Sequence, residues 1–291
     1  MKIVHFCAGL EEWNGMARNA RELVKEETRD GFDSHLTNNS YEISGKIDVV
    51  YIHGAWLPIL WKVAKRAKAI RAKLIIMPEA SYDPIRRAYH GWKKRLVSLF
   101  EHAMLRRADV VMAACEEERE WIDGYHPGLN IEITDLKRFF NLSKPIIFSH
   151  PKDAMTPIHV LYLGRKHPLK GLEYLEQAVA ELNYCCKSRI PGCENINYVE
   201  LKIVSGVFGA ELEKIWEWTD VLCLPTLTED FGRVVAEALE RGKPVITTDG
   251  APAWKGQKGV IYLEGYRNAV PRTRVSLLKY AIFEFLSSDQ P

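Results

Sequence analysis

The sequence predicts an α/β fold of two domains, each built on a parallel sheet. Short apolar runs typical of buried strands alternate with helical patterns, which indicates parallel sheets covered by helices on both faces. The chain has 291 residues, 47% of them hydrophobic, and is long enough to bury two cores. Around residues 141–157 the periodicity is lost and prolines collect, as in an interdomain linker. We therefore expect one domain over residues 1–145 and a second over residues 146–291.

In the first domain, strands and helices are expected in strict alternation. The helix that follows the first strand places Ala17, Ala20 and Leu23 on one face. The loop before this helix contains Gly15, which can let the backbone approach a ligand closely. The expected strands span 2–7, 48–53, 73–77 and 109–114, and the expected helices 16–28, 57–69, 85–107 and from 116 onward.

The second domain repeats this alternation. Pro225 ends one strand because proline cannot donate to a ladder. Asp230 is expected to cap the next helix, and Gly242 to end it. The polar segment 187–197 is expected at the surface. The expected strands span 158–163, 199–204, 220–224 and 244–248, and the expected helices follow Lys170 and span 211–218, 230–242 and 270–286.

Two loops that follow strands of the second domain carry candidate site residues. Glu229 precedes a helix, and Glu237 lies about two turns inside it. A helix N-terminus attracts a phosphate or a sugar, because its unpaired N–H groups and the positive end of its dipole point into the site. The alternative is that Glu229 and Asp230 only cap the helix and that Glu237 is solvated.

The second loop follows the strand at 158–163 and contains Gly164, Arg165 and Lys170. Arginine offers a planar fork of donors and lysine a mobile point charge, and both are common partners of a diphosphate. The alternative is two exposed cations. In an open parallel sheet, loops after strands meet at the carboxyl edge, where ligands bind.

These motifs together resemble family 4 retaining glycosyltransferases of the GT-B architecture, which has two Rossmann-like domains facing across a cleft. The resemblance rests on the two glutamates with seven residues between them, and it covers roughly the second half of the chain. In the first half it rests on layout alone. The matching segments are Gly164-Arg165, Lys170-Gly171, Glu229 to Glu237 with Phe231-Gly232, and Gly242-Lys243-Pro244-Val245-Ile246.

The resemblance implies transfer of a sugar, with retained configuration, from a nucleotide-diphosphate sugar to a hydroxyl of a glycan or glycolipid. It implies catalytic roles for Arg165, Lys170 and Glu229, with the two cations on the diphosphate and Glu229 on the sugar hydroxyls. It implies that Glu237 binds the ribose of the donor. The residues it implies for the donor site as a whole are Gly15, Gly164, Asp230, Phe231, Gly232 and Glu237. No bound cofactor and no metal are expected, because cations and a helix end neutralise the diphosphate and no Asp-x-Asp motif occurs.

Two departures from the family's pattern lie in the first domain. Its first loop has one glycine, Gly15, where the family often has a pair, and Pro78-Glu79-Ala80 stands where a His-Gly pair is common. Either Glu79 or His53 then does acceptor-side work or that work is dispensable; both could also be structural residues. These departures leave open a catalytically silent partner or regulatory subunit. A nicotinamide-dependent oxidoreductase is disfavoured, because no Gly-x-Gly-x-x-Gly follows the first strand.

Composition and charge bear on location and partners. The net charge of +2 predicts no nucleic-acid partner. The six cysteines are scattered like the buried thiols of a reducing compartment. No apolar run approaches the ~20 residues that span a bilayer. We expect a cytoplasmic protein, at most resting on the inner face of the membrane.

One stretch is strongly basic. Residues 62–107 hold thirteen lysines and arginines against three acids, with interleaved aromatic residues. This combination suits a surface that rests on anionic lipid headgroups. The alternatives are a solvated basic face and, less favoured, a nucleic-acid groove. A membrane-borne glycolipid, as in lipopolysaccharide biosynthesis, is therefore the acceptor we expect.

Overall fold

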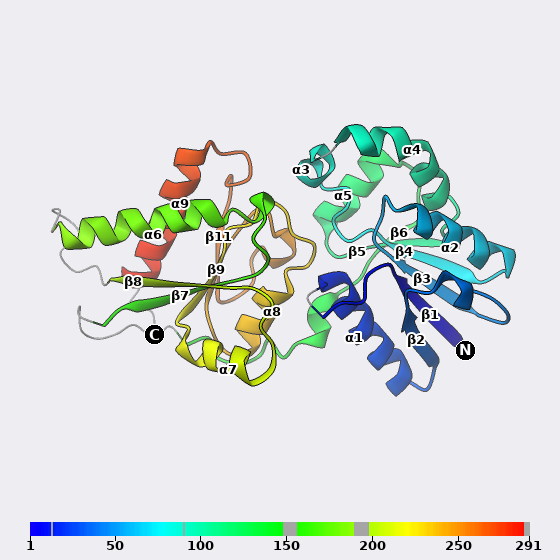
Figure 1. The fold of residues 1–291 in the computed structure, drawn as a ribbon, viewed down its shortest axis with the longest axis horizontal. Helices are drawn as coiled ribbons and strands as arrows, with labels where there is room; N and C mark the ends of the chain where they lie inside the picture. The colour runs from blue at the N-terminus through cyan, green and yellow to red at the C-terminus, as the bar shows by residue number, and fades with distance from the viewer. Residues whose placement is uncertain (13, 90, 148–155, 189–197, 288–291) are drawn as a thin grey trace. The chain divides into compact units, whose positions relative to one another are not determined.

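The computed structural model describes residues 1–12, 14–89, 91–147, 156–188 and 198–287. The chain divides into two compact units, Met1–Phe139 and Phe140–Pro291 (Figure 1). The division lies a few residues before the boundary that we predicted at 145. Both units are α/β, with every strand pair described being parallel. The predicted fold class is confirmed.

The first unit is built on a six-stranded sheet in the order β2-β1-β3-β4-β5-β6. Its strands are β1 (Lys2–Cys7), β2 (Asp33–Thr37), β3 (Val49–His53), β4 (Lys73–Met77), β5 (Val110–Ala113) and β6 (Ile131–Ile133). Its helices are α1 (Gly15–Arg29), α2 (Pro58–Ala69), α3 (Pro84–Ala88), α4 (Gly91–Leu105) and α5 (Glu116–Tyr125), with 3-10 turns η1 (Ser40–Glu42) and η2 (Leu136–Phe139).

The sheet of the first unit is buried on both faces. Val4 and Val50 belong to the larger core, which α2 completes with Leu60 and Val63. Their strand neighbours Ile3, Val49, Ile75 and Val110 form a second cluster. This alternation follows from the two-residue period of a strand, and it explains why central strands read as continuous apolar runs.

One element of the first unit differs from its prediction. The expected helix at 85–107 is two helices, α3 and α4. Asp83 caps α3, with Oδ1 accepting from the Ile85 N–H at 2.8 Å. The backbone is extended at Tyr89, with ψ of 116°, and this ends α3 before α4 begins. The apolar pattern continues through the break, so the pattern alone predicts one helix.

The second unit has a five-stranded sheet in the order β11-β10-β9-β7-β8. Its strands are β7 (Ile158–Leu163), β8 (Val199–Val204), β9 (Val221–Leu224), β10 (Val245–Thr248) and β11 (Val260–Leu263). Its helices are α6 (Leu172–Lys187), α7 (Gly209–Trp218), α8 (Arg233–Glu240) and α9 (Pro271–Ser287), with 3-10 turns η3 (Pro168–Lys170) and η4 (Pro252–Trp254). Most of the surface segment predicted at 187–197 lies outside the described residues.

Candidate functional site

The order of strands in the second unit marks one edge of its sheet as a binding site. The chain runs from β7 outward to β8 and then returns to the other side of β7 as β9. In open α/β sheets, ligands bind outside the carboxyl ends of strands where the order reverses in this way. The loops after β7 and β9 flank this point, and they are the two loops that carry the predicted site residues.

Lys170 and Glu229 form an ion pair between these two loops. Lys170 ends the turn η3, and its Nζ contacts Glu229 Oε2. The same Nζ lies 3.5 Å from the carbonyl oxygen of Thr228. Only 14% of the lysine side chain and 17% of the glutamate side chain are exposed. The pair is therefore set into the protein and is not a flexible surface contact.

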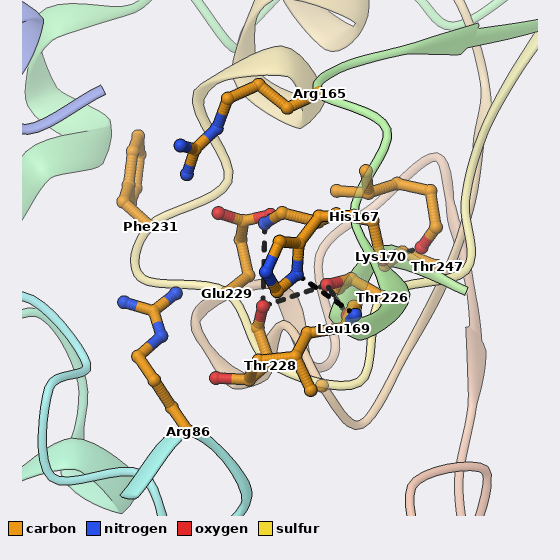
Figure 2. A network of polar contacts seen from close by, with 12 residues as sticks. Arg86, Arg165, His167, Leu169, Lys170, Thr226, Thr228, Glu229, Phe231 and Thr247 are labelled. Atoms are coloured by element: carbon orange, nitrogen blue, oxygen red, sulfur yellow. Dashed lines mark hydrogen bonds and ion pairs between the residues drawn. The ribbon is translucent and has the colours of Figure 1, made fainter. Parts of the chain in front are cut away.

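Backbone contacts hold the two loops against each other (Figure 2). The carbonyl oxygen of Leu169 accepts from the Leu227 N–H at 2.8 Å. The Thr226 hydroxyl also lies 3.3 Å from the Leu169 carbonyl, and 2.9 Å from the Thr228 carbonyl of its own loop. The Glu229 N–H donates at 2.7 Å to the carbonyl of Gly250, in the loop after β10. These bonds fix the backbone on which the ion pair depends.

Arg165 enters the same edge from the end of β7. Its carbonyl oxygen accepts from the Tyr162 hydroxyl at 2.8 Å. Burial raises the pKa of the Tyr162 phenol; the charge of Glu229 raises it further and that of Arg165 lowers it. Both charges therefore act at this position, and Figure 2 shows the arginine side chain reaching toward the region of Glu229 and Phe231.

Helix α8 begins at this edge without a side-chain cap. The capping position is held by Gly232, in the left-handed region with φ of 71°, and glycine has no side chain that could bond to the first turn. The prediction that Asp230 is the cap residue is wrong, because the cap position lies two residues later. A Cβ at Gly232 would lie 3.2 Å from Glu229 Cγ and from Trp254 Nε1. An uncapped helix end of this kind suits an anion.

Aromatic packing fixes the start of α8. Trp254 donates its indole N–H to the Phe231 carbonyl, and the two rings lie 5.0 Å apart. Phe231 is buried and also packs near Phe140. Phe231 and Gly232, two of the predicted site residues, thus fix the backbone at the start of α8.

Glu237 is a buried residue of α8, with 7% exposure. Its Oε1 lies 3.9 Å from Arg233 Nε, one turn earlier on the helix. The guanidinium of Arg233 in turn lies over the Phe140 ring. The alternative that Glu237 is a solvated helix position is therefore wrong.

Gly15 belongs to the other unit, where it is the first residue of α1. Asn14 caps this helix by accepting from the Met16 N–H at 3.1 Å. Nothing lies within 4 Å of the position where a Cβ would stand on Gly15, so packing does not require a glycine there. Its role in donor binding stays a prediction.

The sequence did not predict several residues that contact the candidate site residues of either unit. In the second unit it missed Tyr162 and Thr226, which support the site through contacts between strands or loops. In the first unit it missed Glu27 and His5, which join His53 and Glu79 in one hydrogen-bonded chain. No spacing in the sequence signals these contacts, because each depends on neighbours brought together by the sheet.

Each half of the chain matches a family of glycosyltransferase domains. Residues 32–128 match the family described as "Glycosyl transferase 4-like domain", and residues 157–273 match the one described as "Glycosyl transferases group 1". The first match lies in the first unit and the second in the second unit. No curated protein sequence matches the chain.

Solved structures agree on the fold. Sucrose-phosphate synthase from Thermosynechococcus elongatus is 15% identical with a TM-score of 0.68, and the match covers 99% of this chain and 90% of that one. HepE of Anabaena, in complex with UDP and glucose, is 15% identical with a TM-score of 0.58, over 98% and 94%. WaaG, a glycosyltransferase involved in lipopolysaccharide biosynthesis, is 10% identical with a TM-score of 0.58, over 97% and 90%.

Proposed function

We propose that the chain, whose two halves each match a glycosyltransferase family model, is a glycosyltransferase of the GT-B type that transfers a sugar with retention from a nucleotide-diphosphate sugar to a hydroxyl of a glycan or glycolipid. The observation that carries the proposal is the set of charges at the carboxyl ends of β7 and β9, which we call the β7/β9 edge. The Lys170–Glu229 pair, Arg165 and the uncapped start of α8 gather there on a rigid backbone.

In the proposed mechanism, Arg165, Lys170 and the first turn of α8 hold the diphosphate. Negative charge builds on the leaving phosphate as the bond to the sugar breaks, and donors fixed at that place stabilise the transition state more than the ground state. The acceptor oxygen bonds to the anomeric carbon on the face that the phosphate leaves, and its proton passes to the leaving phosphate oxygen.

The two glutamates take different parts of the donor. Glu229, held by Lys170, accepts hydrogen bonds from hydroxyls of the sugar. Glu237, buried on α8, accepts from the ribose hydroxyls. Metal independence is part of the proposal, because Arg165, Lys170 and the helix end supply positive charge. HepE was solved with UDP-glucose, so uridine donors are the first to test.

Turnover tests this proposal. The protein is incubated with UDP-, GDP- and ADP-sugars and bacterial glycolipid extracts, and release of nucleoside diphosphate is measured. Glu229→Gln should lower release by about 10²- to 10³-fold, as for loss of one fixed polar contact at the reacting centre. Glu176→Gln, on the exposed face of α6, is the matched control and should leave it unchanged.

Three outcomes separate the alternatives. Retained configuration at the anomeric carbon, read by NMR of the product, supports the proposal, whereas inverted configuration contradicts it. Binding of a nucleotide without release from any donor would favour the silent partner.

Helix α4 offers a surface for the membrane, which we include in the proposal. Trp92, Leu96, Leu99 and Phe100 follow helical spacing, and each is more than 60% exposed. Lys93 and Arg95 flank this apolar stripe, and Arg106 and Arg107 follow the helix. Apolar anchors with basic flanks suit a bilayer surface that contains anionic lipids.

The opposite face of α4 is anchored in the unit. Glu101 is buried and accepts from the Tyr82 hydroxyl at 2.7 Å and from Trp61 Nε1 at 2.9 Å. The apolar stripe is therefore held outward by the packing of the helix. No helix in the described ranges is long and apolar enough to cross a bilayer.

Location in the cytoplasm is the last part of the proposal. In the part of the chain that the structure describes, Cys7, Cys115, Cys185 and Cys223 are thiols that form no disulfide. Free thiols are typical of a reducing compartment.

Sedimentation with vesicles tests the membrane surface. The protein should bind vesicles that contain phosphatidylglycerol more tightly than pure phosphatidylcholine vesicles, and Leu99→Glu should weaken that binding by at least about tenfold, because a charge opposes insertion. Tyr280→Glu changes another exposed apolar residue, on α9, and should have no effect. Equal losses in both variants would contradict a membrane face on α4.

A further inference from the structure

Four ionisable side chains form one hydrogen-bonded chain through the sheet of the first unit. Glu27 Oε2, on α1, lies 2.9 Å from His5 Nε2 on β1. His5 Nδ1 lies 3.0 Å from His53 Nε2 at the end of β3, and His53 Nδ1 lies 2.9 Å from Glu79 Oε1 just after β4. The chain thus joins α1, through the middle of β1, to the carboxyl ends of β3 and β4.

The position of this chain is one where ligands bind. The strand order reverses between β1 and β3, so His53, at the end of β3, borders the switch point of the first sheet, and His5 lies two residues inside β1. Glu79 and Ala80 both have left-handed backbones, with φ of 55° and 54°. Arg86 Nη1 donates to the Glu79 carbonyl at 2.9 Å, and Glu118 accepts from the Ala80 N–H. Strained residues that neighbours hold in this way are concentrated at functional sites.

The middle of the chain is shut off from solvent. His5 and His53 are buried, and Glu79 is 3% exposed. Burial lowers the pKa of each imidazole to about 4, against smaller opposing effects of Glu27. Both rings are therefore neutral near pH 7, and each carries one proton.

Counting protons then fixes the charge of the chain. Three hydrogen bonds need three protons, and two neutral imidazoles supply two. The third must sit on a carboxyl group, so one of Glu27 and Glu79 is a neutral acid and the other a carboxylate. The chain as a whole holds one negative charge, and both rings must be the same tautomer.

The surroundings decide which carboxyl group is ionised at rest. Glu27 also accepts from the Ser34 hydroxyl at 2.6 Å, and its side chain is 13% exposed, so its carboxylate is better solvated. Glu79 then holds the proton and donates it to His53, and both rings carry their hydrogen on Nε2. Other charged or titratable groups near the chain are Glu11, Arg21, Glu26, His35, Tyr51, Arg86, Glu118 and Arg138.

We propose that Glu27, His5, His53 and Glu79 form a proton relay, in which Glu79 changes from an acid to a carboxylate as Glu27 gains a proton. The Glu79 proton passes to His53 Nδ1, the Nε2 proton of His53 passes to His5 Nδ1, and the Nε2 proton of His5 passes to Glu27. One proton moves in each bond, the total charge stays at −1 and neither ring is left charged. Only the link between this change of charge and sugar transfer rests on the proposed function.

NMR of histidine labelled with ¹⁵N tests the proton count without any substrate. In the wild type at pH 7, His5 and His53 should both be neutral with the hydrogen on Nε2. Glu79→Gln should keep this arrangement, because the glutamine amide can donate to His53 in place of the acid. Two different tautomers, or one charged ring, would overturn the proposal.

A second variant tests transmission along the chain. In Glu27→Gln, raising the pH should ionise Glu79 and move the hydrogen of both rings to Nδ1 in a single step. The double variant Glu27→Gln/Glu79→Gln should lose that step, which assigns it to Glu79. Rings that titrate separately, or that keep their tautomer throughout, would overturn the relay. Urea unfolding of each variant confirms that it is folded.

Turnover supplies the functional readout. If the relay acts as a unit, Glu27→Gln and Glu79→Gln should each lower nucleoside diphosphate release by about tenfold or more, and the double variant should be no worse than either. Nucleotide affinity should not change, because the β7/β9 edge is intact. Additive losses, or none, would overturn the relay, whereas absence of turnover in the wild type would count against the proposed function alone.

Discussion

Gly171 shows how single residues set the geometry of the donor site. It follows Lys170 with φ of 63°, and a Cβ there would lie 2.2 Å from the Pro225 carbonyl oxygen. The loop after β7 can approach the end of β9 only because this side chain is absent. That approach brings the lysine within reach of Glu229.

Gly171→Ala should therefore lower the free energy of unfolding by about 2–4 kcal/mol, from left-handed strain and overpacking together. Nucleotide affinity should fall as well. Gly206→Ala is the control, since Gly206 has φ of 71° but nothing within 4 Å of its Cβ position. It should lose only about 1–2 kcal/mol. Equal losses in urea unfolding would show that the close approach is unimportant.

For single residues, the sequence predicts which ones are candidates for the site better than it predicts the contacts between them. The spacing of Glu229 and Glu237 and the cations of the preceding loop were sufficient to select the candidates, although donor binding by each stays a prediction. The Lys170–Glu229 pair itself could not be derived, because it depends on two strands that are adjacent in the sheet but separated by a third in the chain.

Among elements, the strands inside each sheet were predicted, and of the edge strands only β8 was. β4 and β7 have the predicted bounds, because buried parallel strands are largely apolar runs. β2, β6 and β11 are mostly half-buried or exposed, and β2 and β6 show no such run. The start of α8 was misplaced, because a glycine in a left-handed conformation at the cap leaves no side-chain signal.

The start of α8 can be tested through Trp254. Trp254→Phe keeps the ring but removes the N–H that bonds to the Phe231 carbonyl. It should cost about 1–3 kcal/mol of stability, because a buried carbonyl loses its donor, and it should weaken nucleotide binding. Trp218→Phe, which alters a half-buried indole beside His159, is the control and should leave binding intact. Unchanged calorimetric affinity in Trp254→Phe would contradict this role.

At the scale of the whole molecule, the first unit carries the acid-sensitive groups. Burial lowers the pKa of His5, His53 and His126 to about 4. The unfolded chain, with histidine pKa near 6.5, binds more protons than the folded one between these values. Stability should therefore be lost as the pH falls from about 6.5 to 4. Glu101, whose pKa burial raises, acts in the opposite direction.

Urea unfolding at a series of pH values checks this prediction. Each buried histidine contributes a slope of up to about 1.4 kcal/mol per pH unit. His126→Gln keeps a polar side chain but removes one titrating group, so it should reduce the slope by up to about 1.4 kcal/mol per pH unit. Stability that does not change between pH 6.5 and 4.5 would contradict neutral buried imidazoles, and with them the proton count of the relay.

The whole-molecule fold was predictable because each half contains its own regular alternation of strands and helices. The relay was not, since His5 and His53 lie on β1 and β3 and Glu79 just after β4, and only the sheet brings them together. The same limit applies to the acceptor, which no motif of the first unit specifies.

Calorimetric titration with UDP, GDP and ADP tests the donor site most directly. One nucleotide should bind the wild type, and Arg165→Met should weaken it about 10- to 100-fold, as for loss of a charge-assisted contact worth ~1.5–3 kcal/mol. Lys166→Met, the next residue of the same loop and equally exposed, should bind like the wild type. If no nucleotide binds at millimolar concentration, or if both variants lose affinity equally, the diphosphate site at the β7/β9 edge is contradicted.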